Sequence, residues 1–255
     1  MGLVCLVDGK DSHLAATGSL TLNLPAQKST NSALGQHNPD YFQQPARAMC
    51  YSIIGIQKAM IEYRSGEEAD SQTIAEMMTI ASDGVVDFLF HDLLPGMTPV
   101  QLLALNLAKD NFPHTFKNTI VARQGNEIVG VALSYPSAYH RVTPEMRDFV
   151  PLDRLQHLDD FYSSRVEDSW LLDTLYVADG CRRQGIAGRL LSLVEERAVR
   201  EGYDALSLVV FSDNEPAVQL YKNAGFHAVS RIELKGNQFI QHDGGCLLMK
   251  RESSV

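Results

Sequence analysis

The sequence has no apolar run of the roughly 18 residues that a membrane-spanning helix needs. Its four cysteines, Cys5, Cys50, Cys181 and Cys246, are widely spaced and form no CxxC pair. That spacing argues against a zinc knuckle and against a disulfide framework. The eight histidines show no HExxH or related ligand spacing, so we expect no metal. These absences predict a soluble protein of the reducing cytoplasm, without membrane contact.

Positive charge is also scarce. The chain has 31 acidic and 22 basic residues and a net charge of -9. A nucleic-acid-binding protein would show a basic excess or stripe, so nucleic acid is not an expected partner. An acidic surface would attract a cationic substrate such as an amine, although solubility explains the charge more simply. Hydrophobic residues make up 45% of the chain, which is enough for a sizeable core.

Residues 1–59 differ from the rest of the sequence. Residues 17–45 are rich in Ser, Thr, Asn, Gln, Gly and Pro and show no periodicity, so we expect a poorly ordered or atypical extension. Met60 stands directly before the first strand-like segment. We therefore place the functional domain at residues 60–255, and one hypothesis is that translation starts at Met60.

From Met60 onward the chain alternates between helical and strand periodicity. We read residues 136–168, which hold three prolines, as an insertion between strands. The order indicates an α+β, or mixed α/β, fold in which a strand meander precedes a strand-helix-strand-helix-strand unit. We predict one helix that Asp70 or Ser71 caps and that runs through Ala81, and another that Thr98 caps and that runs through Ala108. The other predicted helices cover residues 85–93, 153–162, 185–201 and 216–224. The predicted strands cover residues 61–64, 119–122, 128–133, 170–177, 205–211, 226–234 and 246–250.

The segment Arg182–Gly188, RRQGIAG, lies between a predicted strand ending at Val177 and a long amphipathic helix. A strand-loop-helix junction leaves main-chain N–H groups unpaired at the helix start, where the helix dipole also favours an anion. Gly185, Ala187 and Gly188 are small enough for a ligand to approach the backbone. The Walker and Rossmann patterns do not match here. The loop alone fits a diphosphate site or an ordinary helix start with solvated arginines.

Two motifs together resemble those of the GNAT N-acetyltransferase superfamily. Arg182–Leu191, RRQGIAGRLL, is similar to the pyrophosphate-binding pattern Q/R-x-x-G-x-G/A, with Arg182, Gly185 and Ala187 at the defined positions. Asn214–Phe226, NEPAVQLYKNAGF, is similar to the second signature N-x-x-A-x-x-L-Y-x-x-x-G-F. Both occur in the expected order and on the expected elements, which makes the resemblance specific.

The resemblance spans residues 171–226 by motif and about residues 60–251 by element order. It implies a GNAT-like acyl-CoA N-acyltransferase fold, a splayed and mostly antiparallel sheet flanked by helices. Coenzyme A would lie where the fourth and fifth strands separate, here residues 170–177 and 205–211.

The resemblance also implies acetyl-CoA as acyl donor and the residues that hold it. Main-chain groups near Leu175 and Val177 would pair with the pantetheine amides, the N–H groups of Arg183–Gly188 would hold the pyrophosphate, and the Asn214 side chain would contact the cofactor. The implied cofactor-binding set is Leu175, Tyr176, Val177, Arg182, Arg183, Gln184, Gly185, Ile186, Ala187, Gly188, Asn214 and Tyr221.

The function implied is direct transfer of an acetyl group from acetyl-CoA to a primary amine in a ternary complex. The alternative is a non-catalytic module that binds or senses acyl-CoA. A small-molecule acceptor is favoured over a protein N-terminus or lysine, because the 136–168 insertion suggests a lidded site. A homodimer is a fair expectation from general frequencies.

Two residues are candidates for proton transfer. The resemblance places Tyr221 as the general acid, since a phenol with a pKa of about 10 can protonate a thiolate whose parent thiol is near 8.5. A core aromatic is the alternative. Asp173 is the candidate base, because burial among apolar neighbours would raise its pKa. A structural hydrogen bond explains Asp173 equally well, and Glu127 and His140 are weaker base candidates.

Cys181 stands beside the loop, so an acyl-cysteine route is conceivable. Nothing in the sequence pairs it with a base, and direct transfer is simpler.

Overall fold

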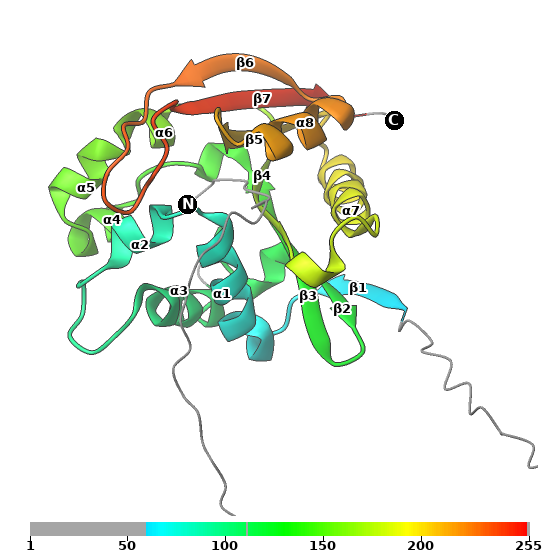
Figure 1. The fold of residues 1–255 in the computed structure, drawn as a ribbon, viewed down its shortest axis with the longest axis horizontal. Helices are drawn as coiled ribbons and strands as arrows, with labels where there is room; N and C mark the ends of the chain where they lie inside the picture. The colour runs from blue at the N-terminus through cyan, green and yellow to red at the C-terminus, as the bar shows by residue number, and fades with distance from the viewer. Residues whose placement is uncertain (1–59, 111, 254–255) are drawn as a thin grey trace, which may run out of the picture. The chain divides into compact units, whose positions relative to one another are not determined.

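One mixed sheet organises the described part of the chain. The computed structural model describes residues 60–110 and 112–253, so the prediction for residues 1–59 lies outside it. The sheet has seven strands in the order β1-β2-β3-β4-β5-β7-β6 (Figure 1). Every neighbouring pair is antiparallel except β4–β5. The strands are β1 Ile61–Ser65, β2 Thr119–Gln124, β3 Glu127–Pro136, β4 Trp170–Val177, β5 Ala205–Phe211, β6 His227–Ile232 and β7 Cys246–Glu252.

Local sequence explains where the helices begin. At α3 the Thr98 side chain accepts from the Gln101 N–H, the Gln101 side chain accepts in return, and Pro99 occupies the first turn. The α-helices are α1 Ser71–Ala81, α2 Val85–Phe90, α3 Pro99–Ala108, α4 Pro144–Phe149, α5 Leu152–His157, α6 Asp159–Ser163, α7 Ile186–Arg200 and α8 Glu215–Asn223; short 3₁₀ turns cover Glu68–Asp70, Phe116–Asn118, Ser137–Tyr139 and Asp179–Cys181.

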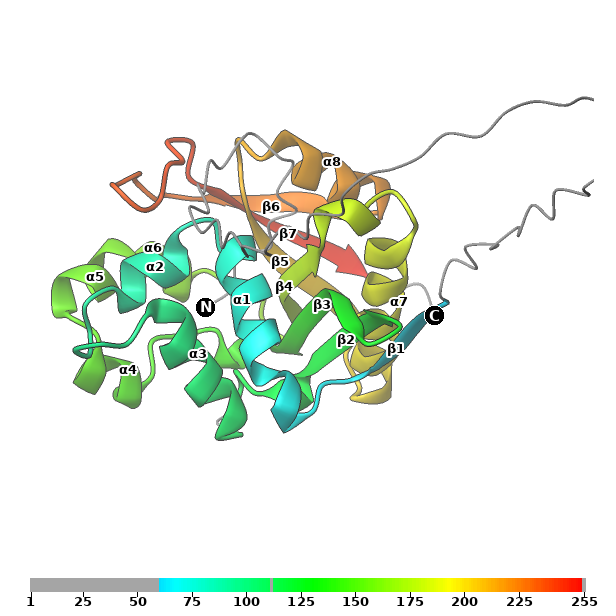
Figure 2. The same cartoon turned by 60° about the horizontal axis from the view of Figure 1, so that its bottom comes forward.

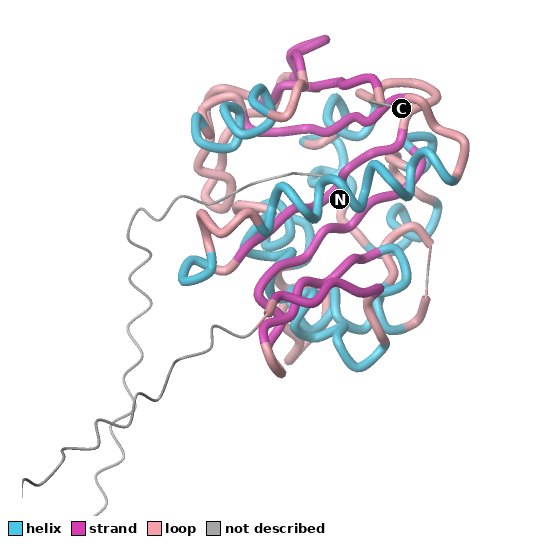
Figure 3. Tube along the Cα trace, turned by 90° about the vertical axis from the view of Figure 1, so that its right-hand side faces the viewer, coloured by secondary structure: helices cyan, strands magenta, loops and turns pink. Residues whose placement is uncertain are grey.

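Helices cover both faces of the sheet around β3 and β4. Alternation along β3 sends Val131 and Leu133 into a core with α1 and α3, whereas Ala132 faces α7. In α7, Leu190 and Val194 are fully buried against that opposite face. Figure 2 separates the α1–α3 layer from the α7 layer, and Figure 3 shows α7 in front of the strands of the sheet.

The β5–β7–β6 arm of the sheet has its own layers. Val209 and Phe211 of β5 face a core formed with α2, α5 and α6. Leu208 and Val210 face the core that includes α8. The arm is therefore covered by the 136–168 segment on one face and by α8 on the other.

One predicted helix is wrong. Residues 153–162 were expected to form a single helix, but α5 ends at His157 and α6 begins at Asp159. Leu158 leaves the helical conformation between them, with φ -105° and ψ 15°. A further helix, α4, begins at Pro144, where Thr143 caps the first turn and the proline occupies the first helical positions.

The sheet opens between β4 and β5, as predicted. These strands pair only from Trp170–Leu206 to Leu172–Leu208, although β4 continues to Val177. At the same place the β3–β4 register shifts, because Leu133 pairs with Thr174 and Ser134 with Leu172. Asp173 is thus the extra residue of a β-bulge, a feature that increases local twist and bends a strand.

Candidate active site

The loop before α7 presents consecutive main-chain donors. Arg183 and Gly185 both adopt left-handed conformations, with φ of 58° and 80°, a geometry that turns successive N–H groups toward one concave side. Within the described residues, the N–H groups of Arg183–Gly188 donate no hydrogen bond. The first turn of α7 adds the positive end of its helix dipole. The loop therefore has the donors that a phosphate or diphosphate requires.

A pocket of about 280 Å³ lies against this loop. It is closed on the other side by α8, so it sits beside the region where β4 and β5 have separated. A Cβ added at Gly185 or Gly188 would meet no atom within 4 Å, so both glycines face open space. The lining residues are Val177, Cys181, Arg182, Arg183, Gly185, Ile186, Ala187, Gly188, Pro216 and Leu220.

The two adjacent arginines of the loop have different surroundings. The Arg182 Nε donates to the Val177 carbonyl at 3.2 Å, and its terminal nitrogen lies 2.6 Å from Asp179. Arg182 thus fixes the loop to the end of β4. Arg183 is exposed beside the pocket, where its guanidinium can contribute positive charge.

The remaining predicted cofactor contacts are distributed around the opening. Gln184 does not line the pocket and donates weakly to the Gly180 carbonyl at 3.4 Å. Leu175 and Tyr176 lie in the part of β4 beyond its pairing with β5. One main-chain edge of that segment faces β3, and the other pairs with no strand of residues 60–110 and 112–253, which leaves it suited to a peptide-like ligand.

The second motif forms α8 and its cap. The Asn214 Oδ1 accepts from the Ala217 N–H at 3.1 Å, so its side chain caps the helix. Tyr221 is fully buried in the core shared with α7, and its ring packs edge-on against Phe226 with centroids 5.8 Å apart.

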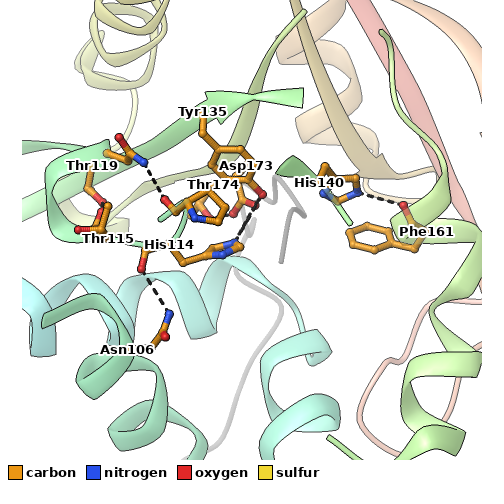
Figure 4. A network of polar contacts seen from close by, with 11 residues as sticks. Asn106, His114, Thr115, Thr119, Tyr135, His140, Phe161, Asp173 and Thr174 are labelled. Atoms are coloured by element: carbon orange, nitrogen blue, oxygen red, sulfur yellow. Dashed lines mark hydrogen bonds and ion pairs between the residues drawn. The ribbon is translucent and has the colours of Figure 1, made fainter. Parts of the chain in front are cut away.

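Asp173 lies at the centre of a buried polar network (Figure 4). Its Oδ2 accepts from the Tyr135 hydroxyl and lies 3.3 Å from the His114 Nε2, while its Oδ1 accepts from the Thr174 hydroxyl at 3.0 Å. Burial alone would raise the pKa of Asp173, but the bonds with His114 and Tyr135 help to hold it well below the usual range. The expected upward shift of the Asp173 pKa is therefore wrong, because the sequence did not reveal these partners.

His140 lies in the segment predicted to be an insertion, where it is buried. It is 1% exposed, and its Nε2 donates to the Phe161 carbonyl at 3.0 Å. Its ring lies 5.5 Å from that of Tyr162. Glu127, the other weak base candidate, begins β3 at an exposed position.

Cys181 lines the loop pocket, and its Sγ donates to the Gln124 side-chain oxygen at 3.7 Å. Within the described residues the thiol forms no hydrogen bond with a histidine, so the geometry adds no support for a covalent route.

Sequence reasoning missed His114 and Tyr135. Each occupies an otherwise unremarkable segment, and His114 lies 59 positions from its partner Asp173. No local spacing pattern connects residues so distant, so only the folded sheet identifies the cluster.

The described residues lack two kinds of feature. No helix within residues 60–110 and 112–253 has the length and apolar character to cross a bilayer. The same residues contain no group of three or more His, Cys, Asp or Glu side chains arranged for a metal ion.

Known proteins with similar sequence or structure form a consistent group. The model of the acetyltransferase (GNAT) family matches residues 88–226. An N-acetyltransferase from Staphylococcus aureus Mu50 is 22% identical with a TM-score of 0.54, covering 74% of this chain and 100% of that chain. A second acetyltransferase structure is 23% identical with a TM-score of 0.50, covering 76% of this chain and 100% of that chain. No curated protein sequence matches the chain.

A mosquito arylalkylamine N-acetyltransferase like 5b shares the fold at greater sequence distance. It is 14% identical with a TM-score of 0.50, covering 76% of this chain and 100% of that chain. The similarity of these structures confirms the predicted splayed sheet and its flanking helices.

Proposed function

Because the chain belongs to the GNAT acetyltransferase family, we propose that it transfers an acetyl group from acetyl-CoA directly to a primary amine. The main support is the row of main-chain donors from Arg183 to Gly188 beside a pocket at the opening of the sheet. That arrangement suits the diphosphate of coenzyme A, whose charge would meet N–H groups and a helix N-terminus.

The rest of the donor fits along the opening. The outer edge of Leu175–Val177 would bind the pantetheine amides, since no strand of the described part of the chain pairs with it. Arg182 would keep the loop in register with β4 through Val177. The thioester would then point toward the bulge at Asp173, where main-chain N–H groups can stabilise a developing oxyanion.

Proton transfer involves Tyr221 and the polar network around Asp173 in this proposal. Tyr221, on the helix that closes the pocket, protonates the leaving thiolate. Asp173 attracts the acceptor amine as an ionised carboxylate, in keeping with its lowered pKa. Asp173 also contacts His114 and Tyr135, and this hydrogen-bonded network would take up the proton that the amine loses.

A small-molecule acceptor remains the favoured class. The 136–168 segment carries α4, α5 and α6 between β3 and β4 and packs into the core beside β5. In that position it would restrict the site to a small acceptor. A cytoplasmic location and a homodimer also remain predictions. Light scattering of the purified protein tests the second.

Release of free thiol from acetyl-CoA tests the proposed activity. The full chain should release thiol only when an amine is added, at a rate that saturates with both substrates. Mass spectrometry should find one acetyl group on the amine. The alternative, a non-catalytic sensor, predicts acetyl-CoA binding without amine-dependent thiol release across amines, polyamines, amino acids and aminoglycosides.

A further inference from the structure

Three buried polar side chains come from distant segments of the chain. Asp173 lies on β4, His140 follows the 3₁₀ turn after β3, and Tyr162 lies on α6. They are 0%, 1% and 3% exposed. The Asp173 charge acts on both His140 and Tyr162, so the three groups lie within electrostatic range. The cluster is located where β4 separates from β5.

The hydrogen bond of His140 fixes which of its nitrogens carries the proton. A carbonyl oxygen only accepts, so the Nε2 bonded to the Phe161 carbonyl must be protonated. Burial keeps the imidazole neutral, which leaves Nδ1 as a lone-pair acceptor. Nδ1 is buried and has no hydrogen-bond partner within the described residues. Figure 4 shows the His140 ring between Phe161 and Asp173.

Tyr162 repeats this pattern. Its hydroxyl is buried and also lacks a hydrogen-bond partner within residues 60–110 and 112–253. Buried polar groups are rarely left unsatisfied in native proteins, so such a group requires an explanation. Two such groups around one ionised carboxylate indicate a missing ligand.

The chemistry of the three groups identifies what they bind. Asp173 offers carboxylate oxygens, His140 offers a lone pair, and Tyr162 offers a hydroxyl oxygen. A primary ammonium group has three donors, no acceptor and a positive charge. We infer that Asp173, His140 and Tyr162 form the subsite that holds the ammonium group of the acceptor. This inference rests on the proposed function and specifies its substrate class.

Aromatic rings define the rest of the subsite. His140 packs edge-on against Phe161 at 5.1 Å and tilted against Tyr162 at 5.5 Å, while His114 packs against Tyr135 at 5.3 Å. Such rings favour a cation and an apolar or aromatic body. Asp173 is the charged group of the subsite, and its ionised carboxylate attracts a cation and repels a substrate carboxylate. The class is therefore a small arylalkyl primary amine with one positive charge and no carboxylate.

Calorimetry with 2-phenylethylamine and three analogues tests this class. The amine is titrated into the full chain, both free and saturated with coenzyme A. It should bind about 10- to 100-fold more tightly than 2-phenylethanol, L-phenylalanine or the trimethylammonium analogue. The alcohol lacks the positive charge, and L-phenylalanine adds a carboxylate. The trimethylammonium analogue keeps the charge but has no N–H donors. Equal binding of any of them overturns the inference.

Variants of His140 separate binding from a structural role. In His140→Asn the side-chain oxygen occupies the place of Nδ1, whereas in His140→Gln the amide replaces the Nε2 contact with Phe161. If Nδ1 binds the amine, His140→Asn should keep the amine affinity within about threefold of the wild type. His140→Gln should lower that affinity about tenfold. The reverse order would show that His140 only supports Phe161 and would overturn its place in the subsite.

Isosteric changes test the other two groups. Asp173→Asn should weaken 2-phenylethylamine binding about 10- to 100-fold and Tyr162→Phe about 3- to 10-fold. Tyr139→Phe is the matched control, since Tyr139 is 43% exposed, and should bind like the wild type. Unchanged binding in Asp173→Asn contradicts the inference.

Coenzyme A titrations in the same series separate the two proposals. Amine binding without coenzyme A uptake would overturn the proposed function and leave the ammonium subsite supported. Coenzyme A uptake with no amine binding would overturn the subsite alone. Thermal unfolding of each variant confirms that a loss of binding reports on the site rather than on folding.

Discussion

Tyr221 is the residue on which the proposed chemistry depends most. Replacing it with phenylalanine removes one hydroxyl from a fully buried ring and leaves the contact with Phe226 in place. Because general acid catalysis contributes roughly 100- to 10,000-fold, Tyr221→Phe should lower kcat at least about 100-fold. Acetyl-CoA affinity should change less than about threefold.

Steady-state kinetics and calorimetry measure these two quantities. Tyr63→Phe, in the half-buried edge strand β1, is the control and should retain full turnover. Normal turnover in Tyr221→Phe would mean that the tyrosine is only a core aromatic.

His140 should make the protein sensitive to acid. Burial lowers its pKa to about 4, whereas the unfolded chain has the ordinary value of about 6.5. Between these values the unfolded state binds the proton and the folded state does not, so stability falls as pH drops through this window. The loss should reach roughly 3 kcal/mol.

Urea denaturation at pH 7 and at pH 5 checks this effect. His140→Gln should show a shallower fall in the free energy of unfolding over the same pH range. Parallel pH profiles for the two proteins would show that another group causes the acid sensitivity.

At the scale of elements, the first turn of α7 is the segment on which the proposed diphosphate binding depends most. The Gly188 Cα faces open space, so an aspartate there should fold without a clash. A carboxylate near a helix N-terminus is favourable. Both aspartate and alanine are also better helix formers than glycine. Gly188→Asp should therefore keep or raise Tm, yet its charge would oppose the diphosphate.

Gly188→Asp should thus keep or raise Tm while it lowers the affinity for coenzyme A, so a loss of binding could not be attributed to unfolding. Coenzyme A affinity should fall more than about 100-fold, because juxtaposed like charges cost several kcal/mol. Gly188→Ala is the neutral control and should bind more tightly than Gly188→Asp. Equal affinity in these two variants would place the diphosphate elsewhere.

A second element-scale contact joins the segment between β6 and β7 to two other turns. The His242 Nε2 lies 2.7 Å from Asp83 and its Nδ1 lies 2.7 Å from Asp213. Its ring stacks on Phe211 with centroids 3.7 Å apart. Burial opposes the charged form, but the two carboxylates prevail and raise the pKa of His242.

This contact should weaken in alkali, in contrast to the His140 effect. A raised folded pKa gives stability that is complete below about pH 6.5 and is lost as pH rises through the folded value. Denaturation curves from pH 6 to pH 9 should be steeper for the wild type than for His242→Gln. An unchanged slope in the variant would exclude His242 as the source.

The sequence predicted element bounds most closely for the buried apolar runs and the long amphipathic helix, whereas the helix predicted at 85–93 ends at Phe90. Strands β4 and β5 match their predicted bounds to the residue, because each is a buried apolar run. Helix α7 lies within one residue of its predicted ends. Residues 153–162 failed because helical periodicity did not reveal the break at Leu158.

The candidate site was predictable only in part, for a physical reason. The loop before α7 is a contiguous motif, so its donors could be placed from sequence. The partners of Asp173 are brought to it by strand pairing and a bulge, which depend on the whole sheet. The direction of its pKa shift could not be predicted without them.

At the scale of the molecule, the β4–β5 ladder is the narrow connection between two arms of the sheet. It spans three residue pairs, from Trp170–Leu206 to Leu172–Leu208. A ligand in the opening would contact β4 and the loop on one side and α8 on the other. Donor binding should therefore stabilise the fold as a whole.

Thermal unfolding with and without coenzyme A measures this effect. At a concentration 100 times Kd the expected stabilisation is about 2.7 kcal/mol. For a domain of this size that corresponds to an increase in Tm of roughly 5–10 °C. No increase at saturating ligand would argue against a site that joins the two arms.

Calorimetric comparison of coenzyme A with pantetheine tests the central claim most directly, because pantetheine lacks the diphosphate. If the N–H groups of Arg183–Gly188 hold that group, coenzyme A binds with one site per chain and pantetheine binds at least about 100-fold more weakly. Equal affinity for the two compounds, or no uptake of coenzyme A by the folded chain, would contradict the account.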